Sequence, residues 1–125
     1  MRSSVESDLV SLCVKGGILF FKYKDQIHLG LQQAIEIVAT RMKLQRGVPY
    51  PILCDISGVM DVDSEARRYL AVEGALLSKA IAFITDKPIS ERISHMFLKN
   101  YSAKFPVKVF KSKEEALKFL DLYKQ

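Results

Sequence analysis

The sequence lacks the residues by which small extracellular or metal-stabilised domains are usually held together. It has only two cysteines, Cys13 and Cys54, and both lie within apolar, strand-like runs. Cysteines placed in this way are typical of packing residues in a reducing compartment, and we expect no disulfide between them. The sequence also has no Cys-x-x-Cys pair, no glycine-rich phosphate loop and no recognisable nucleophile motif. We therefore expect a protein that is not an enzyme and that holds no cofactor or metal.

Long hydrophobic runs are also missing. No apolar stretch approaches the roughly 20 residues that a membrane-spanning helix needs. The first eight residues contain no apolar segment that resembles a secretory signal peptide. These two absences predict a soluble, cytoplasmic protein.

The composition is that of an ordinary globular domain. The chain has 125 residues, of which 49% are apolar and 26% are charged, so we expect one domain over residues 1–125 with a core of its own. The net charge of +5 lies entirely in residues 87–125, whereas residues 1–86 are balanced. The lysines of this basic part are spread singly and no nucleic-acid motif accompanies them. We interpret them as a solvated surface and expect no nucleic-acid partner.

The hydrophobic pattern alternates between strands and helices after an initial hairpin. Gly16 and Gly17 separate two apolar runs and supply the positive φ angles of a tight turn. The predicted strands are residues 9–14, 18–23, 51–55, 80–85 and 105–110, and the predicted helices are residues 30–46 and 64–78 and segments that begin near Pro88 and after Ser112. This order, ββαβαβαβα, predicts an α/β fold with a mixed, mostly parallel five-stranded sheet and four helices.

Helical spacing also predicts which side chains face the core. Asp63 is expected to cap the second helix, and Ser112 with Glu115 fits a capping box at the fourth. Met60 is expected to fill the core. The predicted buried stripes are Leu31, Ile35, Val38 and Met42 in the first helix, Ile89, Ile93, Met96, Phe97 and Tyr101 in the third, and Ala116, Phe119, Leu120 and Tyr123 in the fourth.

The segment that points to a function follows the third predicted strand. An apolar run ends at Asp55, a small polar turn follows, and Asp61, Asp63 and Glu65 then lead into a helix. The carboxyl ends of parallel strands are where functional loops gather. Glu65 falls in the first turn of the helix, where unpaired N–H groups and the helix dipole favour a negative charge.

This segment and the element order resemble the STAS/SpoIIAA-like family, the domain of bacterial anti-sigma-factor antagonists. The family signature joins the third strand to the next helix in the form Asp-Leu-Ser-x-Val-x-x-Ile-Asp-Ser-Ser-Gly. Glu65 stands where the family carries its phosphorylated serine, and Ala66 stands where it has glycine. The ending, residues 106–116, resembles an uncharacterised SpoIIAA-like branch that is sometimes compared with lipid-carrier domains. The matching positions are Asp55, Ile56, Ser57, Val59, Val62, Asp63 and Ser64.

The resemblance implies a regulatory module that docks a protein partner, with a permanent charge in place of a reversible phosphate. The alternative for Glu65 is that it only complements the helix dipole, which is worth about 0.3–1 kcal/mol. The alternative for the whole chain is a carrier or sensor that binds a small apolar or lipid-like ligand. The residues we expect at the partner-binding surface are Ser57, Asp61, Asp63, Ser64, Glu65, Arg67 and Arg68.

Three other interpretations carry less weight. Asp61-x-Asp63-x-Glu65, with Asp55, suggests a cation pocket, but the glycine and the distal glutamate of a calcium loop are missing. A phosphoacceptor at Asp55 and a Cys54–histidine pair have no supporting motif, and an apolar run disfavours the Cys54 thiolate.

We also expect a homodimer, because the apolar side chains of residues 18–23 indicate an exposed strand edge. The side chains in question are Phe20, Phe21 and Tyr23.

Overall fold

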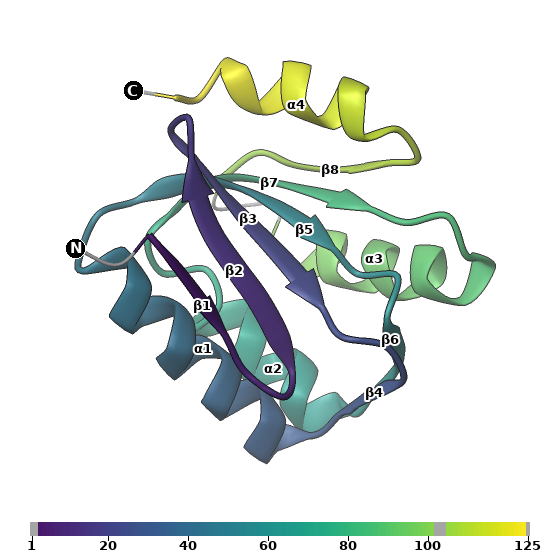
Figure 1. Cartoon of the computed structure of the whole chain (residues 1–125). Helices are drawn as coiled ribbons and strands as arrows, with labels where there is room; N and C mark the ends of the chain where they lie inside the picture. Colours follow the sequence, from purple (N-terminus) through teal and green to yellow (C-terminus); the bar gives the residue numbers. More distant parts are fainter. Residues whose placement is uncertain (1–2, 102–104, 125) are drawn as a thin grey trace.

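The computed structural model describes residues 3–101 and 105–124, and only the backbone over residues 98–101. In this part of the chain, six strands form a mixed sheet in the order β1-β2-β3-β5-β7-β8 (Figure 1). β1 pairs with β2 and β2 with β3 in antiparallel fashion, and the other three pairs are parallel. The predicted mixed, mostly parallel sheet is confirmed, with one more strand than expected. The strands are β1 (Ser4–Glu6), β2 (Val10–Lys15), β3 (Ile18–Tyr23), β5 (Tyr50–Asp55), β7 (Ser78–Ile84) and β8 (Val107–Phe110).

The added strand, β1, carries no pattern by which the sequence would reveal it. It is three residues long, its outer residues Ser4 and Glu6 are exposed, and only Val5 is half-buried. The hairpin that follows is as predicted, because Gly16 and Gly17 have φ angles of +60° and +81°. Two successive positive φ angles match the twist of the flanking strands.

The expected exposed edge is wrong. Strand β3 lies inside the sheet, between β2 and β5, so Phe21 and Tyr23 are buried and Phe20 is half-buried. The outer strands of the sheet are β1 and β8. The homodimer stays a prediction, but it loses the argument on which it rested.

A second, two-stranded parallel sheet, which the sequence did not predict, joins β4 (Ile27–Leu29) to β6 (Val59–Val62). It lies beyond the carboxyl ends of β3 and β5 (Figure 1). Ile27, Leu29 and Val59 are buried in the core. Met60 is 38% exposed, so its expected place in the core is wrong.

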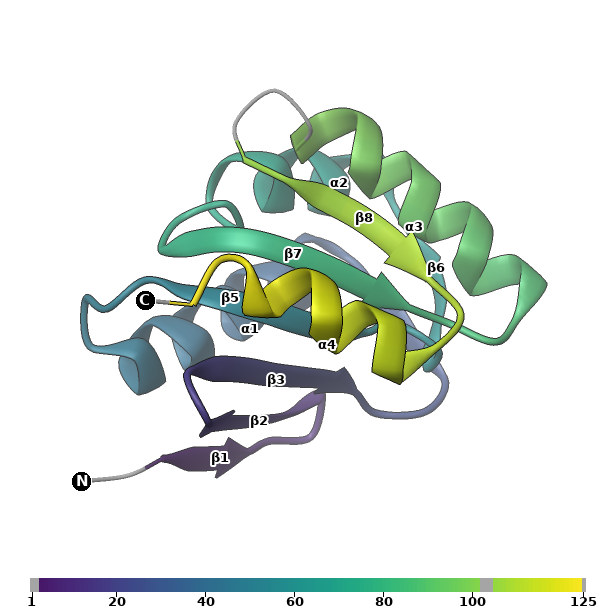
Figure 2. The same ribbon diagram turned by 90° about the horizontal axis from the view of Figure 1, so that it is seen from above.

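Helices cover both faces of the main sheet, but unequally. The helices α1 (Leu31–Gln45), α2 (Ser64–Val72) and α3 (Pro88–Tyr101) pack on one face, and α4 (Lys113–Asp121) lies on the other (Figures 1 and 2). The core under α4 contains Ala80, Ala82 and Ala116, whose small side chains let the helix approach β7 closely.

The fourth helix follows its sequence pattern. Ala116, Phe119 and Leu120 are buried and Tyr123 is half-buried, as predicted. The Ser112 hydroxyl accepts a hydrogen bond from the Glu115 N–H at 3.3 Å, so the expected N-cap is confirmed.

The predicted buried stripes of α1 and α3 are each partly wrong. In α1, Val38 is buried as expected, but Ile35 is 38% exposed and the core instead receives Arg41 and Gln45. In α3, Ile93 and Phe97 are buried as predicted, whereas Ile89 is 46% exposed and two serines are fully buried in its place. The side chain of Tyr101 lies outside the described residues. The buried serines are Ser90 and Ser94.

The buried polar residues of α1 bind the turn that follows α2, which is shorter than predicted. The Arg41 guanidinium donates to the carbonyls of Gly74 and Leu76, at 2.8 and 3.1 Å, and to the Gln45 amide oxygen. The Gln45 amide in turn donates to the Leu77 carbonyl at 2.9 Å. These bonds hold the turn between α2, which ends at Val72 instead of residue 78, and β7, which begins at residue 78 instead of 80.

Candidate functional site

The predicted site begins at the carboxyl end of β5. The Asp55 carboxylate accepts a hydrogen bond from the Ser57 N–H at 3.0 Å, which closes a short turn. The Ser57 hydroxyl lies 3.4 Å from the Asp86 carboxylate, in the loop after β7. Gly58 follows, and a Cβ atom there would lie 2.0 Å from the carbonyl oxygen of Lys24. Only glycine therefore lets this turn pack against the segment that joins β3 to β4.

Asp61 lies on β6 and points away from the core. Its carboxylate is 2.7 Å from Nδ1 of His28, the residue in register with it on β4. The two side chains are 64% and 69% exposed, so water screens the pair and its contribution to stability is small. His28 is a neighbour of the site that was not predicted from the sequence. The only local signal was its position between two apolar residues, Ile27 and Leu29, which is a strand-like alternation.

Asp63 joins this small sheet to α2. Its backbone N–H donates to the Leu29 carbonyl at 3.0 Å, and its carboxylate accepts from the Ala66 N–H at 2.8 Å. The predicted N-cap is therefore confirmed. Ser64 and Glu65 follow in the first turn of the helix and both are exposed.

Loss of this cap is expected to destabilise the domain measurably. We expect Asp63→Ala to lower the free energy of unfolding by about 1 kcal/mol, because the Ala66 N–H loses its partner at the helix terminus. Asp63→Asn should recover most of that loss, since asparagine caps about as well, and Ser64→Ala should change it by less than about 0.5 kcal/mol. Urea unfolding followed by circular dichroism measures all three, and equal stability of the alanine variant and wild type would contradict the assignment.

The two arginines continue the same helix. Arg67 is half-buried and Arg68 is exposed, and neither forms an ion pair with any described residue. Six of the seven predicted surface residues thus lie on one continuous segment, from Asp61 to Arg68, in which negative charge precedes positive charge. Ser57 is set apart, because its hydroxyl points to Asp86.

The cation pocket, which was the less favoured interpretation of these carboxylates, does not form in the described part of the chain. The carboxylates of Asp55, Asp61 and Asp63 are each bound to a different neighbour, as given above. Across residues 3–101 and 105–124, no three metal-ligating side chains come together.

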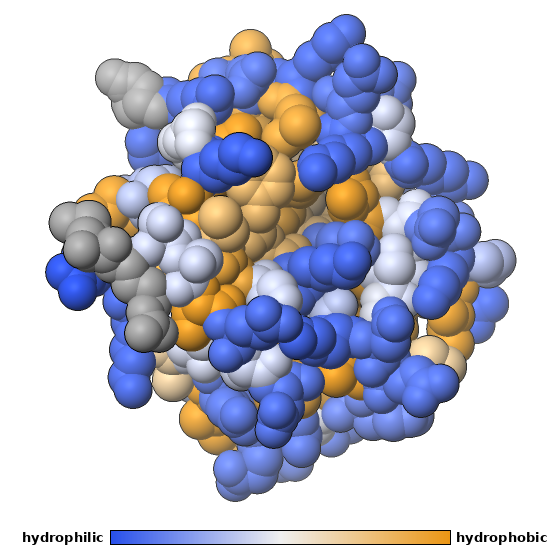
Figure 3. Space-filling model, viewed as in Figure 1, coloured by the Kyte–Doolittle hydropathy of each residue, from blue (hydrophilic) through white to orange (hydrophobic). Residues whose placement is uncertain are grey.

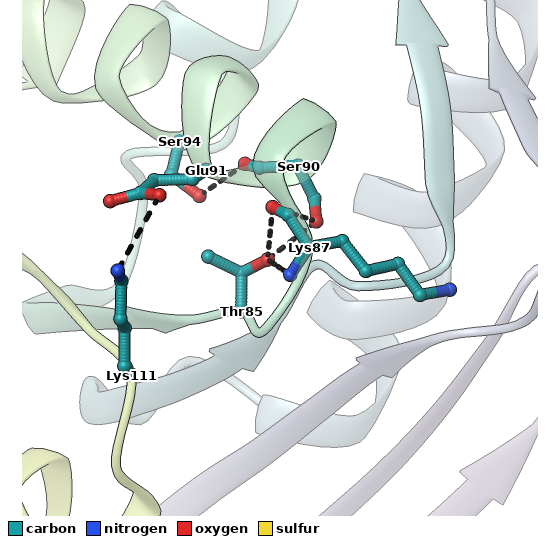
Figure 4. Close-up of polar contacts among 6 residues, drawn as sticks. All are labelled: Thr85, Lys87, Ser90, Glu91, Ser94 and Lys111. Atoms are coloured by element: carbon teal, nitrogen blue, oxygen red, sulfur yellow. Dashed lines mark hydrogen bonds and ion pairs between the residues drawn. The ribbon is translucent and has the colours of Figure 1, made fainter.

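The start of α3 fixes the loop that carries Asp86. Figure 4 shows the Thr85 hydroxyl, which accepts a hydrogen bond from the Lys87 N–H at 3.2 Å and is bound to the Ser90 hydroxyl. The Ser94 hydroxyl donates to the Ser90 carbonyl at 2.8 Å, so both buried serines are satisfied. The pattern of apolar residues could not reveal this polar junction.

The core between the sheet and helices α1 to α3 encloses a cavity of about 40 Å³. Ligand pockets usually occupy about 300–1,000 Å³, so this cavity gives no support to the carrier interpretation. Cys54 lines it, and burial raises the pKa of its thiol, which disfavours the thiolate that a nucleophile needs. Cys13 and Cys54 are both free thiols, as expected.

The family "Domain of unknown function (DUF7793)" matches residues 12–124. The chain belongs to this family. Among curated proteins, no match is found for this DUF7793 member.

Solved structures of other proteins share the fold of this DUF7793 member. An uncharacterised protein of the DUF3478 family from Shewanella loihica PV-4, described as having a SpoIIAA-like fold, is 18% identical with a TM-score of 0.65, covering 96% of this chain and 98% of that one. An anti-sigma factor antagonist from Mycobacterium paratuberculosis is 17% identical with a TM-score of 0.65, covering 90% and 92%. At such identities the likeness establishes the fold alone, and the predicted SpoIIAA-like fold is confirmed.

One further feature concerns membranes. Among the described helices, none combines the length and the apolar character that crossing a bilayer requires.

Proposed function

We propose that this chain is a non-enzymatic, cytoplasmic regulatory module of bacteria that binds a protein partner of the anti-sigma-factor type. The observation that most directly supports this proposal is the position of Glu65. It is exposed in the first turn of α2, next to the end of the parallel sheet, in the segment that resembles the signature of the anti-sigma-factor antagonists. The fold shared with the Mycobacterium paratuberculosis anti-sigma factor antagonist supports the same proposal.

The charge at Glu65 defines how such a module would behave. A phosphorylated serine brings about −1.5 to −2 charges to a helix terminus and can be removed again. A glutamate brings a permanent −1, so the ordinary phosphorylation switch is absent from this position. Binding would then be governed by the concentration of the partner and not by modification of residue 65.

The neighbouring side chains give the surface its other features. Asp61 and Glu65 offer negative charge, Arg67 and Arg68 offer positive charge, and the exposed Met60 adds apolar area. Complementary charges at the rim of an interface set its specificity and association rate more than its total affinity. We therefore expect the partner to present a basic group to Glu65 and an acidic group to Arg68.

The test compares partner capture by wild type with capture by variants of this surface. We expect Glu65→Lys and Arg68→Glu each to weaken binding at least tenfold, because each places a like charge against the partner, and Glu65→Gln to weaken it less. Lys118→Glu, on the exposed side of α4, serves as the control for charge and should bind as wild type does. Dissociation constants from calorimetry with the captured partner give the comparison. Equal affinities of all these variants would overturn the proposal.

A further inference from the structure

The face of the sheet that carries α4 is only half covered. Helix α4 packs against β5, β7 and β8 and buries Ile18 at the start of β3, while no helix in the described part of the chain lies over β1 and β2 on this face (Figure 2). Neighbouring strands are about 4.8 Å apart, so β1 and β2 leave a strip about 10 Å wide beside the part of β3 that α4 covers. A single α-helix, with side chains, has a diameter of about 10–12 Å. The open strip is therefore wide enough for one more helix beside α4.

The floor of this strip is apolar where it meets α4. Cys13 of β2 and Phe20 of β3 form the floor and Leu117 of α4 forms the wall, while Ile18, which is 4% exposed, packs with the buried residues of α4. Together they bound a hollow of about 590 Å³. Figure 3 shows hydrophobic surface in the hollow below α4, surrounded by hydrophilic side chains. Phe20 and Leu117 are half-buried in the free chain, so their burial can be completed by an apolar partner.

Four lysines stand at the two ends of the hollow. Lys15 and Lys124 are at the β2–β3 hairpin, where the Lys124 side chain lies against Gly17. Lys22 and Lys113 are at the other end, in an adjoining hollow of about 320 Å³ that shares Phe20 and Lys113 with the first and continues it. The Lys113 ammonium lies 5.6 Å from the centre of the Phe20 ring, directly over the apolar floor.

Two carboxylates face the same hollow, and both are already bound. Asp121 pairs with Lys124 at 3.2 Å, and Asp55 accepts the Ser57 N–H. Among the described residues, Lys15, Lys22 and Lys113 take part in no ion pair. Asp55 keeps its negative charge, but each end has two lysines and one carboxylate, so an excess of positive charge remains at both ends.

The spacing of these charges sets the length of a complementary partner. Lys15 is in register with Ile18, and Lys22 lies four residues beyond Ile18, which is about 13 Å along the strand. Helix α4 runs from Lys113 to Asp121, which is about 12 Å, and Lys124 lies just beyond its end. Three turns of α-helix cover about 16 Å. We propose that this hollow docks an amphipathic helix of a partner protein, about three turns long, with acidic residues at both ends of its apolar stripe.

The charge pattern favours this occupant over two others. A single-headed anionic amphiphile would neutralise the positive charge at one end of the hollow and leave the charge at the other end without a partner. A second copy of the chain offers no such helix, because the acidic residues at the start of α2 and α4 are followed by Arg67, Arg68 or Lys118. The proposal does not rest on the proposed function, since the hollow is lined by other residues than the Asp61–Arg68 surface.

The test uses two synthetic peptides of about 16 residues, stapled as helices, with the same leucine stripe. One carries glutamates at both ends and the other carries lysines there. We expect the acidic peptide to bind the full chain at least tenfold more tightly in fluorescence anisotropy. Lys15→Glu/Lys113→Glu should weaken its binding at least tenfold. Lys108→Glu/Lys118→Glu, with the same change of charge on exposed residues outside the hollow, and Glu65→Lys should weaken it less than threefold.

Several results would overturn the proposal. One is equal binding of the two peptides, and another is an equal loss in both double variants. A third is a dimer in light scattering that Lys15→Glu/Lys113→Glu dissociates, which would make the occupant a second copy. A fourth is perturbation of the Phe20 and Leu117 amide resonances by sodium laurate but not by the acidic peptide. Circular dichroism of each variant confirms that the fold is intact.

Discussion

Replacing Arg41 by alanine is expected to lower the free energy of unfolding by about 3–5 kcal/mol. The Arg41 side chain is 3% exposed and donates to two backbone carbonyls and to the Gln45 amide oxygen. The bond to Gln45 is buried and the two bonds to carbonyls are partly buried; a fully buried acceptor left without its donor costs about 1–3 kcal/mol, and the loss of the long side chain adds a cavity to the core. The effect should appear as a lower midpoint in urea denaturation.

Two further variants separate the causes. Arg41→Met keeps most of the volume but none of the donors, so it should recover only the packing part of the loss. Lys43→Ala removes an exposed cation from the same helix and should change the stability by less than about 0.5 kcal/mol. If Arg41→Ala were no more destabilising than Lys43→Ala, the buried hydrogen bonds would contribute nothing to stability.

The second large effect is expected at Gly58, where even alanine should lower the free energy of unfolding by about 3 kcal/mol or more. The added methyl carbon would lie 2.0 Å from the Lys24 carbonyl oxygen and 2.7 Å from its carbon. These are backbone atoms, so no side-chain rotation relieves the clash. The turn would have to move, and the hydrogen bond from the Ile27 N–H to the Gly58 carbonyl, 2.9 Å long, would be strained.

Gly47→Ala supplies the comparison. Gly47 has a φ angle of +79° and open space around its Cα, so alanine there meets only the cost of a left-handed backbone, about 1–2 kcal/mol. Thermal unfolding of both variants gives the two values side by side. A Gly58→Ala variant as stable as Gly47→Ala would show that the β5–β6 turn moves freely away from the β3–β4 segment.

The parts of the fold that depend on local chemistry were predictable from the sequence. The Gly16–Gly17 turn and the caps at Asp63 and Ser112 involve residues close together in the chain, and all three are present. The burial of Arg41 was not predictable, because its partners Gly74 and Leu76 lie more than thirty residues away. The spacing of apolar residues predicts the wrong buried face of a helix when a charged side chain is buried by hydrogen bonds to a loop distant in sequence.

The same distinction holds for the candidate site. Its main segment, from Asp61 to Arg68, is continuous in sequence, so its place at the start of α2 could be predicted. The contact of Asp61 with His28 and that of Ser57 with Asp86 join residues 33 and 29 positions apart. Both contacts depend on which strands become neighbours. The sequence pattern of the short strand β4 was too weak to predict its pairing with β6.

The shortness of β1 has a consequence for behaviour at high concentration. An outer strand of three residues, with a serine and a glutamate exposed on it, gives an incoming chain only a few backbone groups to pair with. The Glu6 carboxylate, paired with Lys24, adds an exposed charge to this edge. This border of the sheet is therefore protected against the strand-to-strand polymerisation that leads to fibrils.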